Sequence, residues 1–360
     1  MNLKTNYLGL SLPHPIVAGA SPLSATVDGI RRLEDAGAAA IVAASIFEEE
    51  IRAADAAFEA AAAIGAESHA ELTSYLPPIP GYRGALAAHV EMIRRAAKSV
   101  STPLIASLNG TTREGWTDIA AVLQEAGAAA LELNLFHIPT EPLETSAEVE
   151  DRLVRTVRDV CESVTIPVAV KLSPNFTAPA NLALALAGAG ARGVVLFNRW
   201  YEADVDLETM MFRSSPRLST AEDVRLPLMW IALLAGKTSL GLAADQGVHE
   251  SKEVVKYLLA GADVVQTASS LLRHGRRHLQ CLVEGLAEWI EAHGAASVDE
   301  IRGCLRTPRF AQPETLLRAQ YVRSLQLEYP VGNLRLTDRA CPERFGLRRC
   351  RCGNSRSGRP

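Results

Sequence analysis

Short runs of apolar and β-branched residues recur along the chain, and each is followed by a stretch whose apolar positions have helical spacing. Some of these runs share a lead-in, in which a helical pattern ends at a glycine shortly before the strand pattern begins. A glycine there takes the left-handed conformation that ends a helix. The runs with this lead-in lie in 33–45, 123–134, 184–198 and 257–269. The other strand patterns lie in 15–21, 103–109, 167–173 and 239–244.

This alternation gives eight strand–helix units, and roughly 250 residues is the usual size of a (β/α)8 barrel. We therefore predict an α/β fold, a TIM barrel of parallel strands surrounded by helices. An open, doubly wound sheet is the alternative. The regular spacing of the strands favours closure of the sheet into a barrel.

Two connections are longer than one loop and one helix require, at about 46–102 and 199–238. Ligands bind at the carboxyl ends of the strands in this fold, so we expect these long βα insertions to act as lids. We assign 1–310 to the barrel and 311–337 to a C-terminal helical extension, a helix and a turn. The segment 338–360 is rich in arginine and poor in apolar residues, so we expect a disordered tail.

Composition narrows the class of protein. The net charge of −4 and the hydrophobic content of 48 % are typical of a globular protein and indicate neither a nucleic-acid nor a membrane partner. The chain has no apolar run of about 18 residues and no signal-peptide pattern at its start. Its six cysteines form neither a disulfide framework nor a zinc-type pair. We therefore expect a cytoplasmic protein without a bound metal.

A lysine stands at the end of one of the buried strands. Lys171 follows the apolar run 167–170, and burial of its ammonium costs several kcal/mol, in order of magnitude, unless an anion replaces the lost water. The side chain could instead reach solvent or pair with a distant carboxylate. Polar residues at the other predicted strand ends favour a ligand, and these are Ser45, Asn109, Asn134 and Asn198.

Asparagine amides are costly to bury without hydrogen-bond partners. An aromatic heterocycle with alternating carbonyls and ring nitrogens would satisfy several of them at once. The first strand ends in the small residues Ala18, Gly19 and Ala20, which let the backbone approach a flat ligand closely. The alternative is that each asparagine simply ends a strand.

A second signal concerns phosphate. Gly247 lies in a turn before a helix that starts near Ser251, and Thr267 and Ala268 follow the last strand. Loops after the seventh and eighth strands of these barrels often hold a phosphate on backbone N–H groups. The position of these residues in the order of strands therefore predicts a phosphate site.

Taken together, these segments resemble the FMN-binding barrel of the dihydroorotate dehydrogenases. The chain looks closest to a dihydroorotate dehydrogenase-like branch that lacks some of the usual active-site residues. The most specific pieces are SLNGTTREGWTD, ALELNLFHIPTEP, PVAVKLSPN, VVLFNRWY and the segment 247–275.

The resemblance implies an FMN-dependent oxidoreductase that acts on a CH–CH bond and oxidises dihydroorotate to orotate in pyrimidine biosynthesis. It implies that Lys171 lies at the pyrimidine edge of the flavin, where reduction places negative charge. The other FMN-binding residues that it implies are Ala18, Gly19, Ala20, Ser45, Asn109, Asn134, Gly247, Thr267 and Ala268. It implies that Asn134 and Asn198 contact the substrate.

Several positions depart from the family pattern. The loop after the fourth strand usually reads Asn-x-Ser-Cys-Pro-Asn, with Cys or Ser as the base, but here 134–139 has His137 in that place. An imidazole can accept a proton near neutral pH, so His137 is the candidate catalytic base, with a solvated loop histidine as the alternative. Ala44 stands where a lysine is expected, and the phosphate turn reads Asp245-Gln246-Gly247, with one glycine of the usual two.

These departures leave two further hypotheses. One is an FMN barrel that acts on a different small unsaturated or cyclic substrate, and the other is a non-catalytic barrel that binds a phosphate-bearing ligand. The partner we expect is a small-molecule substrate. The electron acceptor is left open between fumarate, a nicotinamide and a partner flavoprotein, and a homodimer is left open because members of this family are often dimers.

Overall fold

The computed structural model describes residues 1–63, 84–199, 203–214, 217–307 and 313–328. The chain divides into two compact units, Met1–Ala311 and Gln312–Pro360. The described part of the second unit is helix α12 (Pro313–Glu328), on which Tyr321, Val322 and Leu325 are exposed. The predicted tail at 338–360 lies outside the described residues, and so do residues 64–83 of the first predicted insertion.

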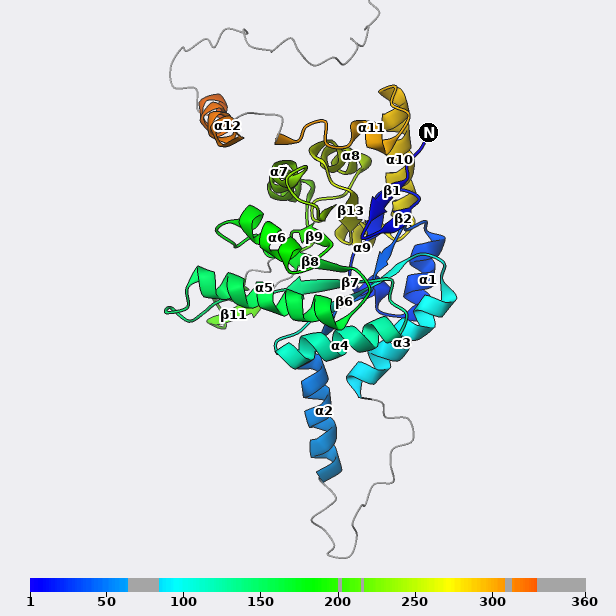
Figure 1. Cartoon of the computed structure of the whole chain (residues 1–360), viewed down its shortest axis with the longest axis vertical. Coiled ribbons are helices and arrows are strands. Elements are labelled where there is room, and N and C mark those ends of the chain that lie inside the picture. The colour runs from blue at the N-terminus through cyan, green and yellow to red at the C-terminus, as the bar shows by residue number, and fades with distance from the viewer. Residues whose placement is uncertain (64–83, 200–202, 215–216, 308–312, 329–360) are drawn as a thin grey trace, which may run out of the picture. The chain divides into compact units, whose positions relative to one another are not determined.

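The first unit is built on a closed ring of parallel strands, which confirms the predicted (β/α)8 barrel (Figure 1). The strands follow one another around the ring as β3 (Ile16–Ala18), β4 (Ile41–Val42), β6 (Leu104–Asn109), β7 (Ala130–Leu135), β8 (Val168–Leu172), β9 (Gly193–Leu196), β12 (Gly241–Ala244) and β13 (Val264–Thr267). β13 pairs again with β3 and closes the ring. A short strand β5 (Ile46–Phe47) continues the second position and pairs with the end of β6.

Helices cover the outside of the ring. Those that contact one another in succession are α1 (Val27–Asp35), α3 (Ala85–Ser99), α4 (Arg113–Glu125), α5 (Ser146–Ser163), α6 (Pro179–Gly188), α7 (Arg225–Leu234), α8 (Ser251–Ala260) and α10 (His278–Ala292). Shorter elements complete the unit: η1 (Pro22–Ser24), α9 (Ser269–His274) and α11 (Val298–Ile301). Of the helices in the described residues, none combines the length and the apolar character needed to cross a membrane.

The helix ends explain why the sequence folds in these units. Thr112 starts α4 by accepting a hydrogen bond from the main-chain N–H of Gly115 at 3.0 Å. Thr145 and Glu148 form a reciprocal capping box at the start of α5. At the other end, Gly127 follows α4 with φ +98° and Gly261 ends α8 with φ +117°, which is the left-handed conformation predicted for these glycines.

Alternate strand residues face opposite sides of the barrel wall. The larger hydrophobic cluster joins Leu131, Leu133, Val170 and Leu172 to the helices, whereas Ala130 and Ala169 belong to a small cluster with residues of the other strands. Because side chains alternate along a strand, the positions two residues beyond Ala130 and Ala169 share the inner face. Those positions carry Glu132 and Lys171, so the upper part of the barrel interior is charged.

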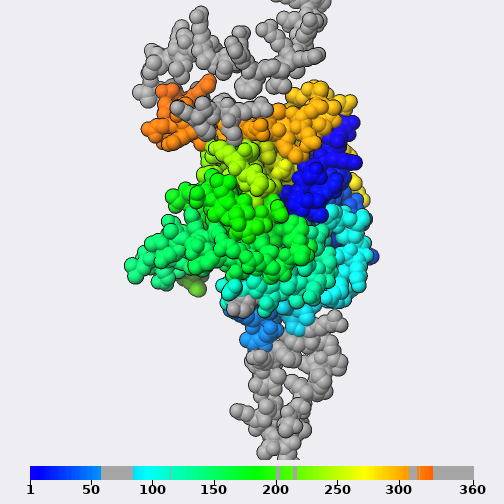
Figure 2. All heavy atoms as spheres, in the orientation of Figure 1, coloured from blue at the N-terminus to red at the C-terminus, as the bar shows by residue number. Residues whose placement is uncertain are grey.

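A hairpin closes the amino-terminal end of the barrel. Strands β1 (Thr5–Tyr7) and β2 (Leu10–Leu12) join through Leu8 and Gly9, both with positive φ as in the hairpin turns that match strand twist. A Cβ on Gly241 would lie 3.0 Å from the ring of Tyr7, and a Cβ on Gly193 would lie 3.1 Å from its hydroxyl, so a side chain at either position would crowd Tyr7. Figure 2 shows the N-terminal residues (dark blue) next to the last helices of the unit (orange), and Asn2 forms a bridge with Ser297.

The two predicted insertions contain additional elements. The first holds α2 (Glu48–Ala63) and α3, and the second holds β10 (Ala203–Asp206), β11 (Met211–Ser214), η2 (Ala221–Val224) and α7. β10 and β11 form an antiparallel hairpin on which Leu207, Met210 and Phe212 are largely exposed. Their function as lids stays a prediction.

Candidate active site

A cavity of ≈ 100 Å³ lies at the carboxyl ends of the strands. It is lined by Ala20, Lys171, Asn198, Arg199, Ser219, Asp245, Gln246, Gly247, Val248, Gln266, Thr267, Ala268 and Ser269. The structure therefore brings together, from the ends of five different strands, six of the residues predicted from sequence: Ala20, Lys171, Asn198, Gly247, Thr267 and Ala268.

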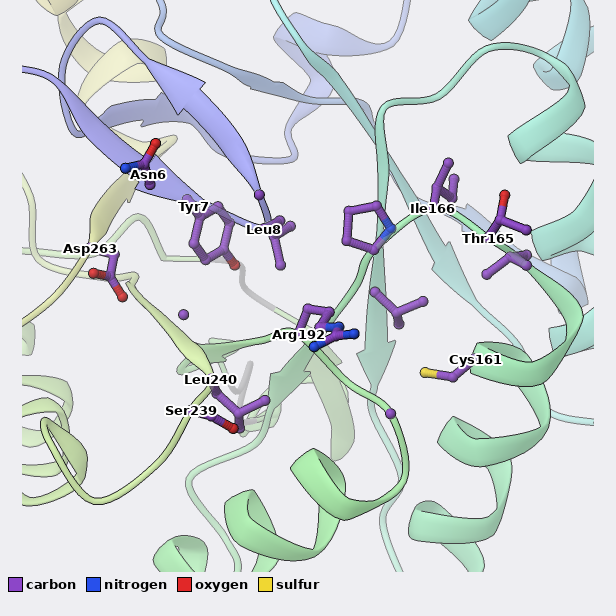
Figure 3. A pocket seen from close by; sticks show the side chains of 16 residues that line it. Asn6, Tyr7, Leu8, Cys161, Thr165, Ile166, Arg192, Ser239, Leu240 and Asp263 are labelled. Carbon is purple, nitrogen blue, oxygen red and sulfur yellow. The ribbon is translucent and has the colours of Figure 1, made fainter.

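A larger pocket, of ≈ 710 Å³, opens at the opposite end of the barrel (Figure 3). The β1–β2 hairpin and the starts of several strands line it, with Arg192 and Asp263 as its charged residues. Ligands of (β/α)8 barrels bind at the carboxyl ends of the strands, whereas the amino-terminal end serves stability. We therefore place the candidate active site at the smaller cavity.

Lys171 is ion-paired with two carboxylates. Its Nζ lies 2.6 Å from Oδ2 of Asp245 and 3.7 Å from Oε1 of Glu132, and its side chain is 10 % exposed. Burial alone would lower the pKa of the lysine, but the charges of Asp245 and Glu132 hold it above its ordinary value. The sequence allowed Lys171 to reach solvent, to pair with a carboxylate or to bind a ligand. The structure shows carboxylate partners, and Lys171 and Asp245 also line the cavity.

Glu132 is a residue of the site that the sequence reasoning missed. It lies in β7 with a side chain 1 % exposed, and burial raises its pKa although the charge of Lys171 opposes that shift. Gln266 donates a hydrogen bond through Nε2 to Oε2 of Glu132 at 2.6 Å. The signal that would have found it is the two-residue period of β7, because Glu132 shares a face with Asn134.

Asp245, the second carboxylate partner of Lys171, was not among the residues that the sequence analysis assigned to the site. It directly follows β12, two residues beyond the inward-facing Ala243, and its main-chain N–H donates to the carbonyl of Leu196 at 2.8 Å. The same two-residue period therefore directs its carboxylate toward Lys171.

The predicted asparagines partly satisfy one another. Asn198 donates through Nδ2 to Oδ1 of Asn134 at 2.8 Å, and Asn134 lies directly opposite Lys171 in the β7–β8 register. Asn109 is buried at the end of β6. Ser45 lies near the same strand, where its Oγ is 2.7 Å from Oγ of Ser107. The contacts of these residues with flavin or substrate stay predictions.

The first strand contributes small residues, as predicted. Ala18 is fully buried, and the main-chain N–H of Gly19 donates to the carbonyl of Thr267 at 2.9 Å. A Cβ on Gly19 would make only ordinary contacts, at 3.6 Å from Gln266. Ala20, one residue further, reaches the cavity.

The predicted phosphate turn has a fixed geometry. Gln246 and Gly247 have φ +80° and +73°, and Gln246 donates through Nε2 to the carbonyls of Phe197 and Asn198, both at 3.0 Å. The hydroxyl of Tyr257 donates to the carbonyl of Gln246 at 2.8 Å. Among the residues that the structure describes, the main-chain N–H groups of Gly247 and Ala268 have no hydrogen-bond acceptor.

His137, the candidate base, lies on the surface. Its Nε2 accepts a hydrogen bond from Arg152 at 2.7 Å, and Arg152 is ion-paired with Glu144. His137 is not among the residues that line the cavity, and its side chain is 41 % exposed. Its catalytic function stays a prediction.

The donor and acceptor groups of the cavity fit the two ends of FMN unequally. The unpartnered N–H groups of Gly247 and Ala268 suit a phosphate, and the buried Oε1 of Gln266, which has no hydrogen-bond partner among the described residues, suits a ring N–H. The volume of ≈ 100 Å³ is below the range of about 300 Å³ and above that is usual for ligand pockets. The cavity therefore has groups that suit the phosphate end of FMN, whereas its volume is too small for the ring.

Comparison with known proteins identifies the family of the chain. The sequence model of the family described as dihydroorotate dehydrogenase matches residues 79–290. A protein of Pyrococcus furiosus named dihydroorotate dehydrogenase B (NAD(+)), catalytic subunit, is 27 % identical over 314 residues, which are 84 % of this chain and 98 % of that protein.

Two other relatives align over shorter ranges. A protein of Aeropyrum pernix, provisionally named dihydroorotate dehydrogenase A (fumarate), is 30 % identical over 233 residues, 62 % of this chain and 73 % of the relative. A Thermococcus kodakarensis protein named dihydroorotate dehydrogenase B (NAD(+)), catalytic subunit, is 29 % identical over 237 residues, 63 % of this chain and 74 % of its own length. Together with the barrel and the polar residues at its carboxyl end, these matches show that the chain belongs to the dihydroorotate dehydrogenase family.

Proposed function

We propose that the protein is an FMN-dependent oxidoreductase that oxidises dihydroorotate to orotate. The observation that carries this proposal is the buried Lys171 at the end of β8, in a chain of this family, beside a cavity lined by Gly247 and Ala268, whose main-chain N–H groups have no acceptor among the described residues. When bound, FMN supplies the acceptor for the two electrons of the C–C bond oxidation.

The residues of the chain have distinct tasks in this proposal. The N–H groups of Gly247 and Ala268 hold the phosphate, and Lys171 provides the positive charge beside the ring. Asn134 and Asn198 orient the substrate through amide hydrogen bonds, and His137 accepts the substrate proton. Because Lys171 already has two carboxylate neighbours, its charge is available to a ligand only in part.

The visible absorption spectrum tests the cofactor, and an anaerobic reduction tests the substrate. The protein is incubated with FMN, excess FMN is removed by gel filtration, and dihydroorotate is then added without oxygen. We expect a bound flavin spectrum that bleaches on addition of dihydroorotate. A colourless protein after this procedure contradicts the proposal.

A second candidate function keeps FMN but changes the substrate. Two observations favour it: His137 is engaged by Arg152 rather than lining the cavity, and Ala44 lacks the ammonium expected there. The substrate would then be another small unsaturated or cyclic compound. A flavin that binds but is reduced only by such a compound, and not by dihydroorotate, would establish this candidate.

The names of the relatives give two electron acceptors, fumarate and NAD(+), so they do not select one for this chain. Reoxidation of the reduced protein by each compound in turn distinguishes them. The acceptor is the one that restores the flavin absorbance within the turnover time.

A further inference from the structure

Both carboxylate oxygens of Asp245 are held in place. Oδ2 lies 2.6 Å from Nζ of Lys171, and Oδ1 accepts a hydrogen bond from the main-chain N–H of Gln246 at 2.8 Å. The turn itself is anchored, because the side chain of Gln246 donates to Phe197 and its carbonyl accepts from Tyr257. The aspartate is therefore a built part of the site and not a surface side chain that meets the lysine by chance.

The two anionic neighbours of Lys171 occupy different sides. Glu132 is 1 % exposed, lies within the barrel and is held by Gln266, whereas Asp245 is 17 % exposed and lines the cavity. Lys171 and Asp245 line the same cavity, so a negatively charged atom that approaches Lys171 from the cavity also approaches the carboxylate of Asp245. The cavity side of the ammonium is already neutralised by the protein.

We propose that Asp245 competes with the ligand for Lys171, and so weakens flavin binding and disfavours the reduced, anionic flavin in particular. This inference rests on the proposed function, because it concerns the same site. A carboxylate at hydrogen-bond distance from the ammonium offsets the charge that would otherwise stabilise the reduced ring. Asp245 thereby selects for ligands whose ring is neutral, or for a conformation in which its side chain has turned away.

The test compares the affinities of the apo-protein for FMN and for riboflavin, which has the same ring without phosphate. Hydrogen bonds to charged groups contribute enough that we expect Asp245→Asn to tighten the binding of both flavins by about tenfold. We expect no such gain when the same change is made in a Lys171→Met background, because that background lacks the ammonium for which Asp245 and the flavin compete. Binding is followed by quenching of flavin fluorescence.

Reduction provides a second readout that does not depend on turnover. A tenfold preference of Asp245→Asn for the reduced over the oxidised flavin raises the midpoint potential by about 30 mV relative to the wild type. Potentiometric titration with mediator dyes measures this shift. An unchanged potential overturns the part of the inference that concerns the redox state.

Controls separate the inference from folding defects and from other effects of charge. Asp245→Asn keeps the shape of the side chain and leaves Glu132 as partner of Lys171, and Asp245→Ser is a smaller second variant. Asp159→Asn removes a carboxylate that pairs with Arg113 at 2.8 Å on the outside of the barrel, and we expect it to change neither affinity nor potential. Thermal unfolding of each variant verifies that it is folded.

Each outcome decides the question. A gain for FMN and inorganic phosphate but not for riboflavin means that Asp245 repels the phosphate, and this overturns the inference. Equal flavin binding by the wild type and Asp245→Asn, or a gain that persists without Lys171, overturns it while the proposed function stands. If Asp245→Asn binds flavin and the wild type does not, the result supports the inference and contradicts the proposed function. If neither the wild type nor Asp245→Asn binds flavin, the result contradicts both.

Discussion

Oε2 of Glu48 accepts a hydrogen bond from the main-chain N–H of Thr112 at 2.8 Å, and so joins the start of α2 to the start of α4. Thr111 contributes its own main-chain N–H to the same oxygen. The carboxylate thus satisfies amides at the beginning of a helix, where a negative charge is favoured. This contact holds the first insertion to the barrel at the carboxyl end of β6.

Glu48→Gln is expected to destabilise the protein by about 1–3 kcal/mol at neutral pH, because it weakens the hydrogen bonds that the buried carboxylate accepts from Thr111 and Thr112. Although burial opposes the shift, the hydrogen bonds from Thr112 and Thr111 lower the pKa of Glu48 to about 2. A lowered pKa gives stability that is present above the ordinary value near 4.5 and is lost as the pH falls toward 2. Denaturant unfolding of both proteins from pH 7 to pH 2.5 should show the difference shrinking in that range. The exposed neighbour Glu49→Gln is the control, and a constant difference at all pH values contradicts the prediction.

Lys171→Met is expected to destabilise the protein by about 3–5 kcal/mol, because it leaves Glu132 and Asp245 without their shared cation. The pKa of Lys171 is raised, so its contribution to stability is present below the usual lysine range and is lost only above it. The pKa of Glu132 is raised mainly by burial, so acidification allows this carboxyl to become neutral in the variant. The stability gap should therefore narrow as the pH falls from 8 to 5. Lys98→Met, at an exposed helix position, is the matched control, and a gap that widens with acidification counts against this account.

Gly247→Ala is expected to damage the phosphate turn more than a left-handed backbone alone explains. Gly247 has φ +73°, and a Cβ there would collide with the backbone of Val224. Gly37 has φ +88° with nothing within 4 Å, so Gly37→Ala measures the conformational cost alone, about 1–2 kcal/mol. We expect Gly247→Ala to lose more stability than this control and to weaken FMN relative to riboflavin. Equal effects of the two substitutions on stability and on flavin binding would show that the contact between a Cβ at residue 247 and the backbone of Val224 does not cause the loss.

If His137 is the base, His137→Asn should slow flavin reduction by dihydroorotate about 100-fold or more, as is usual for loss of a general base. Arg152→Gln removes the hydrogen bond to His137 without removing the imidazole, and we expect it to retain most of the rate. Stopped-flow measurement of the flavin absorbance separates these outcomes, and equal rates for wild type and His137→Asn assign the proton acceptor elsewhere.

The strands could be predicted because each carries an apolar run that is buried on both faces. The runs at 103–109 and 167–173 contain β6 and β8. The glycines marked where a helix ends and the next strand begins. The position of Lys171 at a strand end followed from the same pattern. The barrel was thus encoded in local periodicity.

The partners of Lys171 were harder to predict, because they come from other strands. Glu132 and Asp245 reach the lysine only through the inward alternation of β7 and the register of β9 and β12. A glutamate in an apolar run and an aspartate in a turn have many ordinary explanations. The hairpin of β10 and β11 was likewise missed, since its apolar residues are exposed and follow no core pattern.

The side chain of Tyr7 closes one end of the charged barrel interior, so the two ends of the barrel differ in their access to solvent. This side chain is 2 % exposed and fills the space left by Gly193 and Gly241, and burial raises the pKa of its phenol, with the charge of Glu132 adding to the shift. The uncharged phenol of Tyr7 therefore closes the barrel on the side of the β1–β2 hairpin. Because Lys171 lines the cavity at the opposite end of the barrel, we expect water and protons to reach Lys171 and Glu132 from that cavity alone, and a ligand held there to slow this exchange.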